Sequence, residues 1–380
     1  MFLSRFPGFG GGIIFAVMMR LTLLTFAGAL LVWGQPVSLP LANDKLDVEI
    51  LQTGAGIAGI VLKDDTGKMN PLWQPGRQAG RGHFLCVDGF GPVTKEEAAA
   101  GLRNHGEAVQ QVFQVVVSGK DGKTSTLKLT AKLPLLQENV TRTYRVVDGE
   151  QVLYVETELE SLTAFDRPIS WGEHATIGAP FLEDVKTVVD TPAVRAQTRP
   201  YPANQGGNRR YPPGQNFTWP NAPLTDGTMA DIRFAPAEHN SIGHTTQLMD
   251  PSRPWAWVTA LRTDKHLLVG WVFSRTEFPW LQSWENYPAQ RERMARGLEF
   301  STQPYDLPRR EVVDQATLFG VPTFQWLPAK SKITKRFLLF YTKTPEAFRK
   351  VDDVKFEKGR ITIIDYKAAQ TVTLDASLPL

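Results

Sequence analysis

Residues 151–162, QVLYVETELESL, carry the pattern that decides the fold class. Side chains of a β-strand point alternately to its two faces, so Leu153, Val155 and Leu159 share one face. The opposite face carries Val152 near the start of the segment and glutamates further along it. This alternation predicts a half-buried antiparallel strand.

The same strand signals recur along most of the chain, separated by turns rich in glycine and aspartate. They occur in residues 48–73, 111–134, 266–275, 333–342 and 359–374. Helix signals are few: residues 94–102 and 344–350 each begin with a threonine suited to the N-cap position. We therefore predict an all-β protein, a large antiparallel β-sandwich with few short helices, formed by a single domain over residues 45–380.

The composition argues against several classes of protein. The 380 residues include 42 Lys and Arg against 39 Asp and Glu, which gives a net charge of +3. A charge so close to neutral offers no electrostatic basis for binding nucleic acid or an anionic membrane. Cys86 is the only cysteine, so the chain can form no intramolecular disulfide.

The N-terminal segment, residues 1–34, has the composition of a targeting signal. Residues 13–34 are almost wholly apolar, and Arg20 is their only charged residue. The basic start, apolar centre and small last residue are typical of a secretory signal peptide cleaved before Gln35, and an uncleaved membrane anchor is the alternative. Both interpretations predict an exported protein, periplasmic or secreted, and a single cysteine suits a bacterial periplasm.

Residues 196–229 interrupt the strand pattern. The segment is rich in Pro, Gly and Asn, with arginines and aromatic residues between them. A connection this long is often functional. Two interpretations stay open: a lid that faces a ligand, or a packed crossover between two sheet layers.

The sequence lacks the common motifs for cofactors. None of the six histidines has the spacing of a metal site, and no phosphate-binding, dinucleotide-binding or nucleophile-elbow motif occurs. We therefore predict neither a metal nor an organic cofactor.

Residues 296–306, RGLEFSTQPYD, place a carboxylate within a strand. Leu298 and Phe300 would share one face of it, and Glu299 would lie on the other. Two interpretations fit this arrangement. Glu299 is either part of a solvated outer face or a general base at the floor of a pocket.

Two histidines have unusual neighbours. His105 lies in the sequence NHGEA, directly after Asn104, and His174 lies in SWGEHATIGAPFL. Each of them, taken alone, also fits a structural histidine in a hydrogen-bonded core.

Residues 270–287, GWVFSRTEFPWLQSWENY, combine aromatic and hydrogen-bonding side chains. Sugars offer apolar C–H faces for stacking and hydroxyl groups for hydrogen bonds, so this mixture suits sugar recognition. Trp280 and Trp284 are the candidates for stacking, and Arg275 is the candidate for binding hydroxyls. The alternative is a strand end that packs into the core.

These motifs, in their order along the chain, resemble those of the galactose mutarotase-like proteins, the aldose 1-epimerase superfamily. The resemblance rests on GAGIAGIVLKDDTGK at 54–68, NHGEA at 104–108, WGEHATIGAPFL at 171–182 and GLEFSTQPYD at 297–306. It covers most of residues 45–345 and implies a large antiparallel β-supersandwich.

The resemblance also implies roles for individual residues. Glu299 corresponds to the general base, His174 to the general acid, and His105 to a histidine that binds the sugar. Asn104 is added as a neighbouring candidate for substrate binding, and Asp231 is taken as the sugar-binding aspartate.

The implied function is a carbohydrate isomerase that interconverts the anomers of a monosaccharide or oligosaccharide. Glu299 would take a proton from the anomeric hydroxyl while His174 gives one to the ring oxygen, which requires an ionised Glu299 and a protonated His174. Two alternatives remain: a non-catalytic carbohydrate-binding protein on the same scaffold, and an accessory module of a polysaccharide-degrading enzyme.

Overall fold

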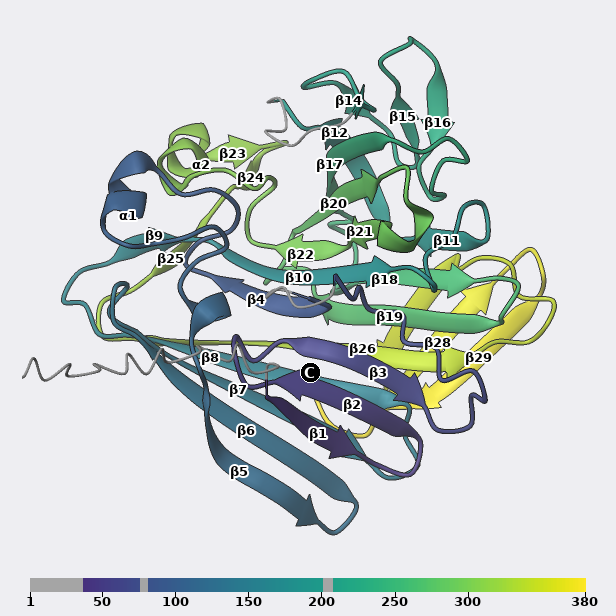
Figure 1. Cartoon of the computed structure of the whole chain (residues 1–380), viewed down its shortest axis with the longest axis horizontal. Coiled ribbons are helices and arrows are strands. Elements are labelled where there is room, and N and C mark those ends of the chain that lie inside the picture. Colours follow the sequence, from purple (N-terminus) through teal and green to yellow (C-terminus); the bar gives the residue numbers. More distant parts are fainter. Residues whose placement is uncertain (1–36, 76–80, 201–207) are drawn as a thin grey trace, which may run out of the picture. The chain divides into compact units, whose positions relative to one another are not determined.

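The computed structural model describes residues 37–75, 81–200 and 208–380. Residues Pro36–Leu380 form one compact unit, and Figure 1 shows that it is built from large sheets with few helices. The strand pairs of the two largest sheets are antiparallel except for one short parallel pair, so the predicted all-β antiparallel sandwich is confirmed. The predicted signal peptide or anchor, residues 1–34, lies outside the described residues. Within the described ranges, no helix is long and apolar enough to cross a membrane.

The larger sheet has 12 strands and carries the candidate site. Its strands are β1 (Ser38–Ala42), β2 (Leu46–Leu51), β3 (Ile57–Leu62), β4 (His83–Val87), β10 (Trp171–Gly178), β12 (Ala193–Thr198), β13 (Asn208–Arg209), β14 (Asn216–Phe217), β17 (Ser241–Met249), β20 (Trp280–Tyr287), β21 (Ala295–Gly297) and β22 (Glu299–Ser301). The short strands β21 and β22 both lie between β10 and β20, and they join two distant parts of the chain.

The second sheet has eight strands and covers one face of the first. Its strands are β5 (Gln114–Asp121), β6 (Thr124–Leu133), β7 (Glu138–Val147), β8 (Val152–Ser161), β11 (Thr187–Asp190), β18 (Trp255–Arg262), β19 (Leu267–Ser274) and β26 (Lys332–Lys343). The main hydrophobic core fills the space between the two sheets, where their inward-facing side chains are removed from water.

A third layer, which the sequence pattern did not reveal, covers the other face of the eight-stranded sheet. It is a three-stranded sheet of β27 (Asp353–Glu357), β28 (Arg360–Asp365) and β29 (Gln370–Asp375), and a second core lies beneath it. The predicted strand at 151–162 is therefore buried on both faces at its start. Leu153 and Val155 enter the main core, whereas Val152 and Tyr154 enter the second.

Short elements complete the fold. They are α1 (Lys95–Ala99), α2 (Arg309–Gln315), two 3-10 turns (Ala108–Gln110 and Arg291–Arg293), and the pairs β9 (Arg167–Ile169) with β25 (Gln325–Leu327), β15 (Asn221–Pro223) with β16 (Met229–Asp231), and β23 (Thr317–Leu318) with β24 (Val321–Pro322). The helix predicted at 94–102 is present, and Thr94 caps it through a reciprocal pair of hydrogen bonds with Glu97. The helix predicted at 344–350 is absent, because the amides of Arg349 and Lys350 bond to the Asp365 carboxylate instead.

A buried polar cluster ties the two large sheets together inside the main core. The Glu173 carboxylate on β10 accepts a hydrogen bond from Arg142 on β7 and contacts His83 Nε2 on β4, each at 3.0 Å. All three side chains are at most 1% exposed. Burial alone would raise the pKa of Glu173, but Arg142 and His83 hold that pKa below its ordinary value. The cluster therefore fixes which face of β10 points inward.

We expect Arg142→Met to lower the free energy of unfolding by about 3–5 kcal/mol, because it leaves the Glu173 charge buried without its partner. Denaturant unfolding measures the change. Arg145→Met, on the same strand but the opposite face, is the control and should change the free energy by less than about 0.5 kcal/mol. Equal effects of the two variants would contradict the role of Arg142.

Candidate active site

Three side chains from three neighbouring strands lie in one row on the outer face of the 12-stranded sheet. Gln282 on β20 is the register partner of Glu299 on β22, and Glu173 on β10 is the partner of Phe300. His174 follows Glu173 and therefore lies beside Glu299. The predicted inward face of β22 is confirmed, since Phe300 is buried in the main core and Glu299 is on the other face.

The imidazole of His174 and the carboxyl group of Glu299 are in direct contact. His174 Nε2 lies 3.2 Å from Glu299 Oε1, and His174 Nδ1 lies 3.0 Å from Thr176 Oγ. Phe84 stacks on the imidazole with 4.2 Å between the ring centroids. Gly297 leaves the space that the carboxyl group occupies, because a Cβ at that position would collide with it. We call His174 and Glu299 the proton pair.

His105 reaches the proton pair from a loop. Its backbone has φ of 68°, the left-handed conformation that few side chains adopt, and Gly106 follows with φ of 83°. The bend brings the His105 ring to 5.1 Å from the His174 ring, and its amide donates to Gly91 O at 3.0 Å. Burial lowers the pKa of His105 to about 4, although Asp306 opposes the shift. The imidazole is therefore neutral at physiological pH.

The structure adds a second carboxylate that we had not identified from the sequence. Asp306 Oδ1 lies 3.1 Å from Arg199 Nη2 and 3.2 Å from His244 Nδ1. His244 Nε2 in turn lies 3.1 Å from Gln282 Oε1, which connects this group to the row. Burial would raise the pKa of Asp306, but His244 and Arg199 hold it below the ordinary value. Asp306 is therefore an ionised acceptor next to the proton pair.

The sequence offered a signal for Asp306, and it marked Arg199 only as one of the arginines in the segment 196–229, but it offered no signal for His244. Asp306 ends the motif GLEFSTQPYD, whose Glu299 had already been chosen. His244 and Arg199 come from β17 and from the end of β12, and only the pairing of these strands brings them together. No local spacing in the sequence signals that pairing.

The protonation of the proton pair differs from the expectation of an ionised glutamate beside a protonated histidine. Burial raises the pKa of Glu299, and the negative charge of Asp306 raises it further. Burial lowers the pKa of His174, and His105 adds to this shift. A buried site disfavours both charged forms, so the free protein favours a carboxylic acid beside a neutral imidazole.

Of the two predicted stacking residues, Trp284 and Trp280, only Trp284 has an accessible ring. Trp284 is half-buried and packs edge-on against Trp73, with 5.9 Å between ring centroids. Trp280 is fully buried and donates its indole N–H to Pro322 O, so no ring face is open to a ligand. The prediction that Trp280 stacks on a sugar is therefore wrong for this conformation.

The remaining predicted residues make no described contact with the proton pair. Asp231 is on β16, where its carboxylate is held by Arg233, and it makes no described contact with the row. Arg275 lies in the turn after β19, where its amide donates to Pro254 O, and no described contact links it to the site either. Asn104 is exposed beside His105. The assignment of Asp231 as the sugar-binding aspartate stays a prediction, and Asp306 is a second candidate because it contacts His244, which is joined to Gln282 in the row.

The segment 196–229 lies partly against the site. Arg199 contacts Asp306, residues 201–207 fall outside the described ranges, and the later part forms β13 to β16 with a small core around Tyr211. Its described residues therefore include a site contact and a small packed core. The predicted crossover between two sheet layers is wrong, because the segment connects β12 to β17, which is its neighbour in the same sheet.

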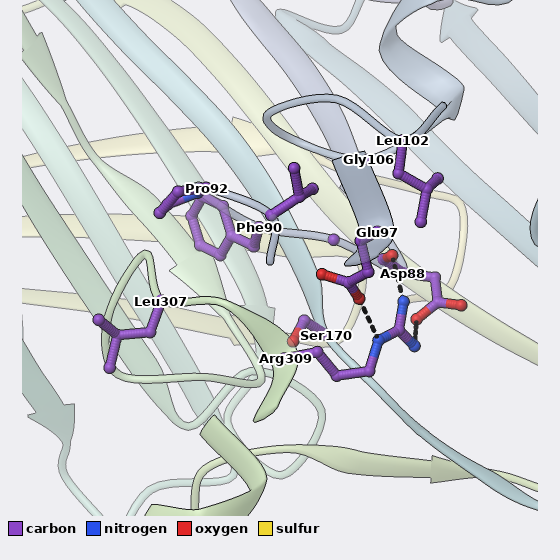
Figure 2. Close-up of a pocket in the computed structure, with 11 residues that line it drawn as sticks. Asp88, Phe90, Pro92, Glu97, Leu102, Gly106, Ser170, Leu307 and Arg309 are labelled. Atoms are coloured by element: carbon purple, nitrogen blue, oxygen red, sulfur yellow. Dashed lines mark hydrogen bonds and ion pairs between the residues drawn. The ribbon is translucent and has the colours of Figure 1, made fainter. Parts of the chain in front are cut away.

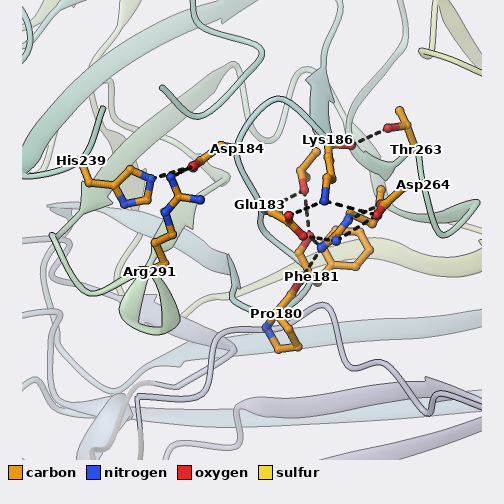
Figure 3. A network of polar contacts seen from close by, with 11 residues as sticks. Pro180, Phe181, Glu183, Asp184, Lys186, His239, Thr263, Asp264 and Arg291 are labelled. Atoms are coloured by element: carbon orange, nitrogen blue, oxygen red, sulfur yellow. Dashed lines mark hydrogen bonds and ion pairs between the residues drawn. The ribbon is translucent and has the colours of Figure 1, made fainter. Parts of the chain in front are cut away.

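A further histidine–carboxylate contact lies in another part of the fold (Figure 3). His239 Nε2 lies 2.8 Å from Asp184 Oδ2, and Arg291 contacts the same oxygen. Because His239 Nδ1 lies 3.1 Å from Pro288 O, both ring nitrogens face acceptors, and the ring is fully engaged in joining two loops. Among the described residues, no group of three or more His, Cys, Asp or Glu side chains could hold a metal ion.

Comparison with known proteins identifies the fold. No protein-family model and no curated protein matches the sequence. A galactose mutarotase-like protein from Clostridium acetobutylicum matches with a TM-score of 0.58 and 14% identity, over 82% of this chain and 97% of that one. A galactose mutarotase related enzyme from Lactobacillus acidophilus matches with a TM-score of 0.55 and 14% identity, over 81% and 98% of the chains.

An Escherichia coli K12 protein, provisionally described as an aldose 1-epimerase, matches with a TM-score of 0.57 and 14% identity, over 81% of this chain and 99% of that one. Each match covers about four fifths of the present chain and nearly all of the other. The chain therefore has the fold of the galactose mutarotase-like proteins.

Proposed function

We propose that the protein is a carbohydrate isomerase that binds a sugar on the outer face of the 12-stranded sheet and interconverts its anomers. The observation that carries this proposal is the contact of 3.2 Å between His174 Nε2 and Glu299 Oε1. An imidazole and a carboxyl group in contact can hold one proton between them and exchange it with a ligand. The likeness to mutarotase-like folds supports a sugar as that ligand, as an analogy at the level of fold.

Anomer interconversion requires two matched proton transfers. Opening the ring removes a proton from the anomeric hydroxyl and adds one to the ring oxygen as the bond from C1 to that oxygen breaks. The proton pair supplies both steps, since one member donates while the other accepts. After rotation about the C1–C2 bond, ring closure returns both protons. Each positioned acid or base contributes roughly 10²–10⁴-fold to the rate.

The surrounding side chains offer hydrogen bonds to sugar hydroxyls. Asp306 is an ionised acceptor, and His105 is a neutral imidazole beside the proton pair. Thr246 Oγ lies in the same row as Gln282 and is buried without a hydrogen-bond partner among the described residues. An unpartnered buried hydroxyl costs about 1–3 kcal/mol, so a polar ligand that bonds to it is stabilised.

Trp284 and Trp73 supply an aromatic wall beside these polar groups. Partly exposed aromatic rings stack on the apolar faces of sugars. Export to the periplasm or beyond remains part of the proposal and rests on residues 13–34 of the sequence alone.

Glu299→Gln should slow anomer interconversion by about 10²–10⁴-fold, because the amide can neither take nor give the proton. The change preserves the shape of a side chain whose neutral form burial already favours, so the melting temperature should not fall. Polarimetry of a freshly dissolved aldose, beside a thermal melt, measures both. Full activity in this variant would exclude Glu299 from the reaction.

The two candidate aspartates give a matched pair of variants. Asp306→Asn should lower kcat/KM by roughly 10- to 10²-fold, because a hydrogen bond to a charged group contributes about 1.5–3 kcal/mol. Asp231→Asn should leave kcat/KM unchanged, since its carboxylate is occupied by Arg233 and makes no described contact with the proton pair. The reverse ranking would favour Asp231 as the sugar-binding aspartate.

The pH dependence of kcat/KM follows from the state with one proton on the pair. A second proton enters as the pH falls through the lowered pKa of His174, and the shared proton leaves as the pH rises through the raised pKa of Glu299. We expect a plateau between these limits, with an acid limb well below the ordinary histidine pKa of about 6.5. The measurement is the catalysed rate after subtraction of the buffer rate, and an acid limb at or above that value would contradict the assignment.

A non-catalytic carbohydrate-binding protein is the second candidate. The burial of His174 and Glu299, which are 7% and 2% exposed, favours it because little of either reacting group is open to a ligand. Calorimetric binding and polarimetry on one sample distinguish the two functions, since binding without faster anomer exchange would identify a carrier or receptor.

A further inference from the structure

One guanidinium joins the two loops that flank the proton pair. Arg309, the first residue of α2, contacts the carboxylate of Asp88 through Nη1 and the Asp88 carbonyl through Nη2 at 3.1 Å. Its Nε donates to Glu97 Oε1 at 3.0 Å, and its Nη1 donates to Pro168 O at 3.0 Å. Figure 2 shows Arg309 lying between Asp88 and Glu97.

Two of the partners of Arg309, Asp88 and Glu97, belong to the loop that ends near His105, whereas Pro168 lies on β9. Asp88 directly follows β4, and Glu97 lies in α1 within the same connection. Further along this connection, Gly91 O accepts the amide hydrogen of His105. Residues 88–106, which we call the His105 loop, are thereby held as one folded unit.

Arg309 itself belongs to the connection that carries Asp306, residues 302–309, which we call the Asp306 loop. The two loops touch directly, because a Cβ placed on Gly91 would lie 2.6 Å from the Asp306 Cβ. Arg309 is three residues beyond Asp306 and forms the polar attachment of this loop to Asp88. Gln303 Nε2 also donates to Phe90 O at 2.9 Å, so the distance between His105 and Asp306 depends on the Arg309 contacts together with this hydrogen bond.

The side-chain type matters because the four contacts come from three different nitrogens of one planar group. A guanidinium holds several acceptors in a fixed geometry, whereas a lysine ammonium acts as a single point charge. The Asp88 side chain is fully buried, so its orientation is set by these contacts. The strands that carry His174 and Glu299 are fixed separately, by sheet pairing.

We propose that Arg309 is a positioning residue that sets the spacing of His105 and Asp306, and with it the affinity of the site for sugar hydroxyls. This inference rests on the proposed function for its effect on the sugar. It assigns Arg309 an influence on KM rather than on the proton transfers, since Arg309 contacts neither member of the proton pair.

Arg167 provides the matched control. It lies on β9 and contacts the other oxygen of the same carboxylate, Asp88 Oδ2, at 2.6 Å. Its second contact is Glu138 on β7, so it attaches the His105 loop to the eight-stranded sheet and makes no described contact with the Asp306 loop. Variants of Arg167 and Arg309 therefore remove one ion pair each from Asp88, but only the Arg309 variants loosen the attachment of the Asp306 loop to Asp88.

The test compares Arg309→Lys and Arg309→Gln with Arg167→Lys and Arg167→Gln. We expect both Arg309 variants to raise KM by between about 10-fold and 10²-fold with little change in kcat, because small displacements of binding groups have effects of this size. The Arg167 variants should lower the melting temperature comparably and leave KM unchanged. An unchanged KM in the Arg309 variants, or equal increases in both pairs, would overturn the proposal.

Amide hydrogen exchange gives a readout that does not depend on activity. Peptides covering 302–308 should exchange faster in the Arg309 variants and remain as protected as wild type in the Arg167 variants. If the wild-type protein proves inactive on sugars, the proposed function fails while this result still decides the positioning role. Unchanged protection of 302–308 in Arg309→Gln would refute that role.

Discussion

The alternation of side chains along β10 is the constraint on which both the core and the site depend. Glu173 points inward, where Arg142 and His83 surround its carboxylate, and His174 points outward beside Glu299. A shift of one residue would exchange the two faces, burying the imidazole and exposing the carboxylate. The inward network makes such a shift costly, because it would leave the Arg142 charge buried without a partner. A contact inside the core thus determines the geometry of a site on the opposite face of the same strand.

The candidate site combines a rigid and an adjustable part. Sheet pairing sets the positions of His174, Glu299 and Gln282, which come from three adjacent strands. His105 and Asp306 come from loops, and the ion pairs of Arg309 hold these loops together. On this arrangement, proton transfer depends on the strands and recognition of hydroxyl groups depends on the loops. Changes in the loops could therefore alter the choice of sugar while the proton pair stays intact.

The fold class could be predicted from the sequence because apolar side chains recur at every second residue of a strand. This alternation is a local feature, visible in residues such as Leu153 and Val155. His174 and Glu299 could also be identified from the sequence, because each of them lies in a recognisable local motif. The contacts of His244 and Arg199 with Asp306 could not be predicted, because they form only through the pairing of distant strands. The wrong prediction for Trp280 has a similar origin.

The polar residues around Trp280 in the sequence suggested an exposed ring. In the structure, the distant chain near Pro322 covers this ring. The layer that covers Val152 and Tyr154 is also formed by a distant part of the chain.

We propose that the imidazole of His174 and the carboxyl group of Glu299 act on one sugar molecule. Saturation transfer between the α and β anomeric proton signals of an aldose, recorded by NMR with the wild-type protein, measures the proposed reaction under equilibrium conditions. We expect an exchange rate that rises in proportion to the protein concentration for at least one member of a panel of aldoses. An exchange rate equal to that in buffer for every aldose in the panel would contradict it.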